Sequence, residues 1–404
     1  MSERVFVTGI GIISSIGIDV QECLLHFKSG QSGIGNISLF DTVHKNSLPV
    51  AEVKYNNTQL LEMLGLSAKE RSFSRTALMG MYAAKQAVKQ AKINPTSATR
   101  VGLISANSVG GMDKSEAFYQ DFLNHPDKGK ISTMLQHDCG DSTEKIADYL
   151  GIKHFVSTIS TACSSSANSI IMGARMIKNN LLDCAVVGGC DALTKFTLNG
   201  FNTLMIFDQQ HCRPFDDSRN GLNLGEGAGF IVLESEKSIK SSGKKILGEL
   251  KGYANTNDAY HQTASSPDGN GAYLAMKQAI ESGGLTADEI DYINVHGTAT
   301  QNNDLSEGIA MKRIFGETVP KFSSTKSFTG HTLGAAGGIE AVFSIMALQE
   351  QIIYPNLRFT TPIKELNLSP ETAFLENIPL KNVLSNSFGF GGNNSTLIFS
   401  AARS

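Results

Sequence analysis

The chain has 404 residues, of which 41% are hydrophobic and 18% are charged, and its formal net charge is −3. This length exceeds what one hydrophobic core usually serves, so we expect two lobes of similar size packed into one unit. The near balance of 35 basic and 38 acidic side chains provides no electrostatic footprint for a polyanion, which argues against a nucleic-acid partner.

The cysteine spacing and the hydropathy of the chain indicate the cellular compartment in which the protein is expected. The six cysteines lie far apart, without a C-x-x-C pair or a histidine cluster at zinc-ligand spacing, so we expect neither a metal site nor a disulfide framework. The N-terminus passes from charged residues directly into a strand-like run, unlike a signal peptide. No apolar run approaches the length that spans a bilayer. We therefore expect a protein of the reduced cytoplasm, with no membrane partner.

Short apolar runs alternate with amphipathic stretches along the chain, which predicts an α/β fold. The runs are continuous rather than alternating, so both faces of the sheet should be covered. The predicted strands are Val5–Thr8, Val101–Ser105, Cys184–Val187, Phe230–Leu233 and Tyr292–Val295. The clearest predicted helices are Ser74–Ala91 and Gly271–Gly283. We interpret Phe40–Lys69 as an irregular surface insertion and Glu234–Lys245 as the seam between two halves.

A weak internal repeat supports the two halves. In the first, Ser160–Cys163 opens the small-residue helix SSSANSIIMGARMI, which precedes the strand CAVVGG. In the second, Ser327–His331 opens TLGAAGGIEAVFSIMAL, and the strand STLIF closes the chain. Helices so poor in charge are usually buried, and their small residues allow close backbone approach. We expect the two helices to lie back to back, each preceded by one reactive residue.

Cys163 is the strongest candidate nucleophile. A thiol at a helix N-terminus sits near unsatisfied N–H groups and the positive end of the helix dipole, which should lower its pKa and favour the thiolate. The alternative is an inert buried cysteine, the class to which we assign Cys23, Cys184 and Cys190.

His296 directly follows a predicted strand, where α/β sheets expose reactive groups. The hydroxyls of Thr298 and Thr300 follow it, and Asp304 and Glu307 come at helix-start spacing. A lone histidine is more often a satisfied structural residue, but this polar context is hard to attribute to packing.

His331 lies between a strand and the second small-residue helix, shortly after Lys326. A lysine at this spacing can orient the imidazole by hydrogen bonding and keep it neutral. A neutral ring N–H can donate to a developing oxyanion. The alternative is that Lys326 is only a solvated loop charge.

The glycine-rich segment Ser387–Asn394 can present backbone N–H groups while Phe390 acts as a gate, although an ordinary glycine turn has the same composition. Two other glycine patterns are not nucleotide sites. The run from Gly9 has Ser14 where a dinucleotide fingerprint needs glycine, and Gly221–Gly229 lacks the Gly-Lys-Ser/Thr of a phosphate loop.

The motifs TACSSS, CRPFDDSRNGLNLGEGAG, VHGTATQNND, TKSFTGHTLGAAGGIEA and NSFGFGGNN together resemble the elongating β-ketoacyl-acyl carrier protein synthases of the thiolase superfamily. The resemblance extends over essentially the whole chain. It implies duplicated αβαβα halves that form a five-layer sandwich, with the nucleophile in residues 1–240 and both histidines and the lysine in 241–404. It also implies a homodimer and acyl carrier protein as the partner.

The resemblance further implies a mechanism of fatty-acid or related chain elongation. Cys163 would accept an acyl group from the phosphopantetheine of the carrier, and the decarboxylated malonyl unit would then attack it in a Claisen condensation. His296 and His331 would stabilise the malonyl thioester oxygen, and the N–H groups of Cys163 and Phe390 would form the oxyanion hole.

The same resemblance assigns supporting roles to Lys326, Asp304 and Glu307 and pantetheine contacts to Thr298 and Thr300. We expect no cofactor beyond the carrier's own prosthetic group. A monovalent cation near Asn294, Glu340 and Asn386 is known in the family, but nothing in the residues demands one.

Two features separate this chain from other members of the superfamily. Chain-initiating synthases have asparagine where His331 stands, and degradative thiolases carry a second cysteine in the C-terminal glycine loop. The chain also departs from the family pattern at Asn393, where threonine is common, and at Asn220 and Asn223. Val109 stands where elongating synthases carry a residue that sets the size of the acyl pocket, so it should resist long straight chains.

Three alternatives remain from the sequence. The chain could be a ketosynthase of a specialised polyketide or aryl polyene pathway. It could be a non-catalytic partner in a heterodimer, or a cysteine hydrolase that releases acyl groups, although a hydrolase would not need two histidines and a lysine around the nucleophile.

Overall fold

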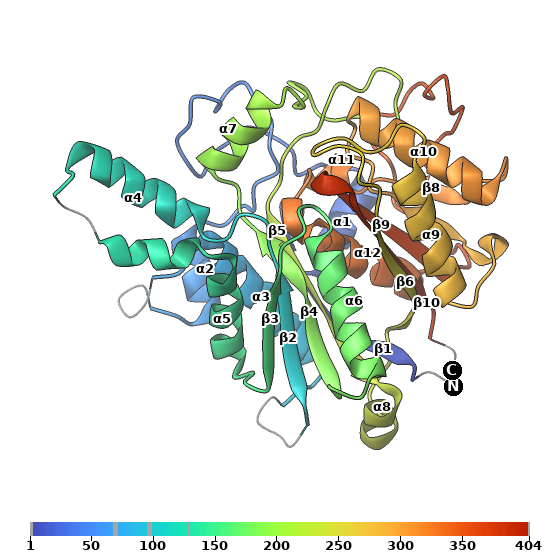
Figure 1. The fold of residues 1–404 in the computed structure, drawn as a ribbon, viewed down its shortest axis with the longest axis horizontal. Helices are drawn as coiled ribbons and strands as arrows, with labels where there is room; N and C mark the ends of the chain where they lie inside the picture. Colours follow the sequence, from blue (N-terminus) through green and yellow to red (C-terminus); the bar gives the residue numbers. More distant parts are fainter. Residues whose placement is uncertain (1–2, 68–71, 95–98, 128–129, 403–404) are drawn as a thin grey trace.

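The structure, a computed structural model, describes residues 3–67, 72–94, 99–127 and 130–402. The strands form one 10-stranded sheet in the order β3-β2-β4-β5-β1-β6-β10-β9-β7-β8 (Figure 1). They are β1 (Val5–Ser14), β2 (Val101–Ala106), β3 (Phe155–Ile159), β4 (Cys184–Asp191), β5 (Gly227–Ser235), β6 (Gly248–Asn257), β7 (Tyr292–Asn294), β8 (Lys321–Ser323), β9 (Asn382–Gly389) and β10 (Asn393–Ser400).

The sheet contains the same topology twice. From the middle outward, the first half runs β1-β5-β4-β2-β3 and the second runs β6-β10-β9-β7-β8. In each half the first strand pairs antiparallel with the fifth, and the fifth with the fourth. The second strand pairs parallel with both the third and the fourth. The halves join where Phe6 and Val7 of β1 pair with Glu249 and Gly248 of β6. The expected α/β architecture with two related halves is therefore present.

Helices cover both faces of each half, which gives five layers. Separate buried clusters place α3 and α5 on the outer face of the first half and α9 and α10 on that of the second, with α6 and α12 in the centre. The α-helices are α1 (Val20–Ser29), α2 (Asn57–Leu64), α3 (Arg75–Gln90), α4 (Met112–Asn124), α5 (Cys139–Leu150), α6 (Ser165–Lys178), α7 (Lys195–Thr203), α8 (Glu236–Ser242), α9 (Asn270–Ser282), α10 (Gln301–Phe315), α11 (Lys326–Thr329) and α12 (Ala336–Glu350). Short 3₁₀ helices are η1 (Ile131–His137), η2 (Ala287–Glu289), η3 (Leu333–Ala335) and η4 (Phe390–Gly392).

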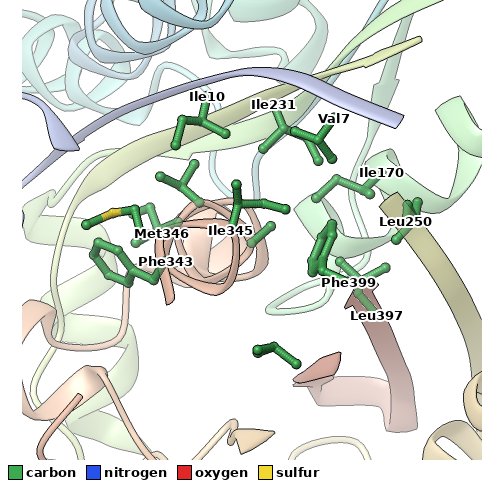
Figure 2. Close-up of a cluster of buried hydrophobic side chains, with 14 of the residues drawn as sticks. Val7, Ile10, Ile170, Ile231, Leu250, Phe343, Ile345, Met346, Leu397 and Phe399 are labelled. Atoms are coloured by element: carbon green, nitrogen blue, oxygen red, sulfur yellow. The ribbon is translucent and has the colours of Figure 1, made fainter. Parts of the chain in front are cut away.

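The two small-residue helices, α6 and α12, pack against each other at the centre of the molecule. The N–H of Gly338 in α12 donates to Oγ of Ser166 in α6 at 2.7 Å. A methyl group on Gly337 would come within 2.9 Å of the backbone nitrogen of Ala167. Figure 2 shows how side chains of α12 lie among apolar groups from both halves of the sheet. The labelled residues are Val7, Ile10, Ile170, Ile231, Leu250, Phe343, Ile345, Met346, Leu397 and Phe399.

The prediction of an irregular insertion over Phe40–Lys69 is wrong for its second half, since helix α2 occupies Asn57–Leu64. Asn56 and Gln59 form a reciprocal capping box at its start, which satisfies backbone N–H groups that would otherwise lack partners. Leu60 and Leu64, one turn apart, are buried against the body of the protein. The last two residues of the predicted insertion lie outside the described residues. No helix in the described part of the chain is long and apolar enough to cross a membrane.

The close approach of α12 to the sheet leads to a stability prediction. A methyl group on Gly338 would overlap the carbonyl oxygen of Gly229 on β5, so Gly338→Ala should lower the free energy of unfolding by about 1 to 3 kcal/mol through overpacking. Gly200→Ala is the matched control, because this glycine is also helical and has no atom near its missing Cβ. Urea denaturation of both variants measures the difference, and equal stabilities would contradict the proposed contact.

Candidate active site

Three turns, each at the end of a strand or next to a central helix, bring the predicted residues together. Cys163 lies between β3 and α6, His296 follows β7, and His331 lies between α11 and η3. All three line one cavity of about 500 Å³. Thr298, Thr300 and Phe390 also line it, together with neighbouring backbone and amide groups. Of the ten predicted site residues, six therefore share this cavity, and the remaining four lie around it.

The thiol of Cys163 is buried and faces an imidazole. Its Sγ lies 3.1 Å from Nε2 of His331, and α6 begins two residues later, at Ser165. Burial raises the pKa of the thiol to about 11, although the N–H of Phe390 and the charge of Lys326 act in the opposite direction. The prediction of a lowered pKa is therefore wrong, because desolvation of the thiolate outweighs the favourable groups around it.

The two histidines stand side by side with their ring planes at 90° and their centroids 5.4 Å apart. Burial and the charge of Lys326 hold the pKa of each ring well below its usual range, so both are neutral. The sequence predicted that Lys326 would hydrogen-bond His331. Instead, its ammonium group lies 3.4 Å from Nδ1 of His296, in the turn after β7.

This lysine fixes the proton position on His296. An ammonium group only donates, so Nδ1 of His296 must accept and Nε2 carries the proton. Lys326 is completely buried, and its charge is balanced by a very short ion pair with Glu340 of α12. Burial raises the pKa of Glu340 to about 7, against the effect of the lysine. Nδ1 of His331 has no hydrogen-bond partner within the described residues.

Two buried carboxylates of α10 hold the turn that carries His296. The N–H groups of His296 and Gly297 donate to Glu307 at 2.8 and 2.9 Å. The N–H of Ala299 donates to Asp304 at 3.1 Å. Burial raises the pKa of Glu307 to about 7, against the opposing N–H donors. Both acids therefore shape the histidine loop and do not line the cavity.

The remaining predicted residues occupy three different positions. The ring of Phe390 stacks on Phe201 of α7, with centroids 5.9 Å apart and planes 19° apart. The hydroxyls of Thr298 and Thr300 lie 2.9 Å apart on the cavity wall. Val109 does not line this cavity; it lies in the loop between β2 and α4.

Backbone strain marks all three reactive turns. Ala162, Ala299 and Leu333 have φ values of 53°, 66° and 53°, in the left-handed region that side chains disfavour. Each is one to three residues from Cys163, His296 or His331. Strained residues persist where the surrounding structure holds them, and they cluster at functional sites.

The sequence reasoning missed two contributors. It considered Glu340 only as a cation ligand, although a single carboxylate within the otherwise uncharged segment AGGIEAVFSIMAL was a signal for a buried counter-ion. It also missed Phe201 as the partner of Phe390, for which the sequence offers no signal because the contact joins distant segments.

The raised thiol pKa predicts how Cys163 reacts with iodoacetamide. With a pKa of about 11, little thiolate exists near neutral pH, so the alkylation rate should keep rising from about pH 7 to about pH 10 without a plateau. Mass spectrometry of the Cys163 peptide follows the reaction, with free glutathione as the reference thiol. A plateau below about pH 8 would show that the sulfur is a stabilised thiolate after all.

Comparison with known proteins identifies the family. Residues 2–238 match the family model described as "Beta-ketoacyl synthase, N-terminal domain", and residues 247–360 match "Beta-ketoacyl synthase, C-terminal domain". The chain is 35% identical over 415 residues to "3-oxoacyl-[acyl-carrier-protein] synthase 2" of Staphylococcus aureus (strain COL), with 98% of each chain covered.

Solved structures agree. "The ishigamide ketosynthase/chain length factor" has a TM-score of 0.92 at 27% identity, with both chains covered in full. A type II polyketide ketosynthase solved with its acyl-carrier protein has a TM-score of 0.88 at 25% identity, also with full coverage. The expected thiolase-type fold and acyl-transferring enzyme class are confirmed. The chain belongs to the β-ketoacyl synthase family.

Proposed function

We propose that this chain elongates acyl chains on acyl carrier protein by decarboxylative Claisen condensation, with Cys163 as the acyl acceptor. The observation that carries the proposal is the meeting of one buried thiol and two neutral imidazoles in one cavity. A thiol accepts an acyl group, and two neutral ring donors suit the charge that develops on a thioester oxygen.

The first step is acyl transfer. Because the thiol of Cys163 is protonated, its attack on an acyl thioester needs a base, and Nε2 of His331 is within 3.1 Å. The sulfur forms a bond to the acyl carbon as its proton moves to His331. The N–H groups of Cys163 and Phe390 face the resulting oxyanion. The carrier's thiolate then leaves and takes the proton from His331, which returns to its neutral state.

The second step is condensation. A malonyl thioester replaces the first carrier, and its carbonyl oxygen accepts hydrogen bonds from Nε2–H of His296 and of His331. His331 therefore carries its proton on Nδ1 when it acts as the base in the first step and on Nε2 here; its Nδ1 has no partner in the described part of the chain that would fix one tautomer. Loss of carbon dioxide leaves an enolate, whose carbon attacks the acyl carbon on Cys163. The cysteine leaves as thiolate, and one proton taken up from solvent restores the thiol. The ammonium of Lys326 disfavours a second proton on either ring. His331 therefore holds an extra proton only transiently in the first step, and neither ring remains as an acid that would quench the enolate.

The cavity suits a pantetheine arm. Among the described residues that line it, none is lysine, arginine, aspartate or glutamate. Hydroxyls of Thr298 and Thr300 and amides such as Asn302 alternate with apolar groups, as a neutral chain with amide and hydroxyl groups requires. Together with the relative solved in complex with its carrier, this supports acyl carrier protein as the partner.

The described residues contain no cluster of histidine, cysteine and acidic side chains that could hold a metal ion. The family's monovalent cation is a different case, and two of the three residues named for it, Asn294 and Glu340, fit it. The amide of Asn386 is instead bonded to Glu307 and Thr396. Both polar atoms of Asn294, Oε2 of Glu340 and Oγ of Ser385 are buried without partners in the described part of the chain. Asn294 and Ser385 are paired across β7 and β9. The oxygens of Asn294, Glu340 and Ser385 would hold the ion, which would supply positive charge there.

A specialised pathway is the second candidate. Two structural neighbours are polyketide or ishigamide ketosynthases by name, and Val109 is a branched residue at the position that the family resemblance associates with the size of the acyl pocket. Product lengths from a panel of acyl-carrier proteins distinguish the two pathways, because housekeeping elongation needs long saturated products. A reduced, cytoplasmic setting stays a prediction; all six cysteines are free thiols.

We infer that the enzyme acts as a homodimer. Helix α4 and η1 project from the body as an arm (Figure 1), and β3 is an edge strand of the sheet. The arm exposes large apolar side chains, namely Tyr119, Phe122, Leu123, Ile131 and Leu135. So much exposed apolar surface on one element favours burial against another chain, and a second copy is the partner that the family implies.

Replacing each histidine by alanine should impair different steps of the reaction. His296→Ala should still acylate Cys163 but lose carbon dioxide release by about a hundredfold or more, because one donor to the malonyl oxygen is gone. His331→Ala should lose both reactions, since it also lacks the base beside the thiol. Intact-mass spectrometry measures acylation, and labelled malonyl-carrier measures decarboxylation.

Two cysteine variants complete this experiment. Cys163→Ser should abolish the acyl mass shift, and Cys139→Ser, outside the cavity, should keep it. Free acid without a condensed product would favour the hydrolase, and absence of acylation in the unaltered protein would contradict a catalytic role.

The dimer has its own test. Replacing Leu123 and Leu135 together by glutamate should give a monomer, because each buried leucine contributes about 1.5 to 3 kcal/mol to association. Val43→Glu, at a still more exposed apolar position outside the arm, is the control and should stay dimeric. Light scattering during size-exclusion chromatography gives the mass, and a monomeric unaltered protein would refute the homodimer.

A further inference from the structure

A buried carboxylate that the proposed mechanism does not use lies at the end of β4, next to the reactive cavity. Asp191 is fully buried, and it accepts hydrogen bonds from the N–H groups of three residues on two separate segments. Oδ2 accepts from Ser108 at 2.8 Å and from Gly334 at 2.7 Å, and Oδ1 accepts from Val109 at 3.3 Å. No side-chain cation is paired with it in the described part of the chain. Burial raises the pKa of Asp191 to about 7, although these donors act in the opposite direction.

The first segment is the loop after β2, which contacts the turn that precedes the reactive cysteine. While the N–H of Ser108 donates to Asp191, its Oγ donates to the carbonyl oxygen of Ala162 at 3.2 Å. Ala162 is the strained residue that immediately precedes Cys163. A continuous path of hydrogen bonds therefore runs from Asp191 through Ser108 to the turn that aims the sulfur.

The second segment is the turn after His331. Gly334 lies three residues after this histidine, in η3, and donates directly to Asp191. A Cβ on Gly334 would come within 2.7 Å of Oγ of Ser108 and 2.8 Å of Oδ2 of Asp191. The two segments therefore meet at this carboxylate with no room for a side chain between them.

We propose that Asp191 is a positioning residue that holds the Cys163 turn and the His331 turn in register and fixes Val109 beside them. The proposal rests on the proposed function and adds a residue to it. The first half of the protein supplies Asp191, Ser108 and Cys163, and the second half supplies Gly334 and His331. One carboxylate thus joins the two halves where the sulfur and Nε2 lie 3.1 Å apart.

The charge of Asp191 affects the pKa of Cys163, and a residue with a purely structural role would not have this effect. Burial, Lys326 and Asp191 all act on the pKa of Cys163, and the negative charge of Asp191 raises it. The other titratable groups that sense Asp191 are the thiols of Cys139 and Cys190. Removing the charge while keeping the shape should therefore make the Cys163 thiolate easier to form.

The test compares Asp191→Asn with Asp183→Asn. Asp183 stands just before the other end of β4, where it pairs with Arg100 at 2.7 Å, so it controls for general loss of a carboxylate that holds this strand. An asparagine at 191 keeps one acceptor oxygen but turns an N–H₂ group toward a backbone donor, which releases one of the two segments.

For Asp191→Asn we expect a condensation rate lower by between about tenfold and about a hundredfold, seen in kcat and not in KM for malonyl-carrier. The pH profile of Cys163 alkylation should shift to lower pH, and longer acyl groups should be accepted because Val109 is less restrained. Asp183→Asn should leave all three readouts unchanged. Unchanged kinetics in Asp191→Asn, or equal changes in both variants, would overturn the proposal.

A second, less disruptive variant tests the proposal even if Asp191→Asn does not fold. Ser108→Ala removes the hydroxyl that bonds Ala162 and also acts on Asp191, but it keeps the backbone N–H that donates to Asp191. It should therefore slow acylation of Cys163 while a pre-acylated enzyme still releases carbon dioxide at the normal rate. Equal loss of both steps would also contradict the proposed path. If the unaltered protein neither acylates nor condenses, the proposed function fails, whereas the alkylation profile still reports whether Asp191 acts on Cys163.

Discussion

The contact between α6 and α12 is the constraint on which the rest of the structure depends. Each helix belongs to one half of the duplicated fold, and each begins just after a reactive turn. Small residues let their backbones meet through Ser166, Ala167, Gly337 and Gly338. Because the starts of both helices are brought together, the turns before them also converge. The cavity with its thiol and imidazole is therefore a consequence of close helix packing at the centre of the molecule.

Burial at this junction decides the chemistry. Desolvation keeps the thiol protonated and both imidazoles neutral, so the resting site holds one compensated charge pair, Lys326 with Glu340, beside uncharged reactive groups. A buried ion pair contributes little to stability, but here the ammonium fixes the tautomer of His296 and disfavours its protonation. A site of this kind protects an enolate better than one with charged imidazolium groups, because proton donors of low pKa are kept away.

Local patterns predicted much of this arrangement, and long-range contacts supplied the rest. Apolar runs bounded by turns located six of the strands, and rare residue types in small-residue turns pointed to Cys163, His296 and His331. Patterns of this kind report only the near surroundings of a residue. The pKa of Cys163 depends on how much distant chain covers it, and its predicted direction was wrong for that reason. Asp191 had no local signal, since its donors lie 83 and 143 residues away along the chain.

The departure at Asn393 acquires a physical meaning from the structure. Its Oδ1 accepts from Oγ of Ser164 at 2.7 Å and from the amides of Asn168 and Asn255, each at 2.8 Å. A threonine hydroxyl is shorter and could not reach all three donors at once. The asparagine therefore ties the end of the glycine loop that carries Phe390 to the first turn after Cys163. Since Phe390 contributes both a ring at the cavity wall and an N–H to the sulfur, this substitution adjusts how firmly the loop is held and leaves the reacting groups in place.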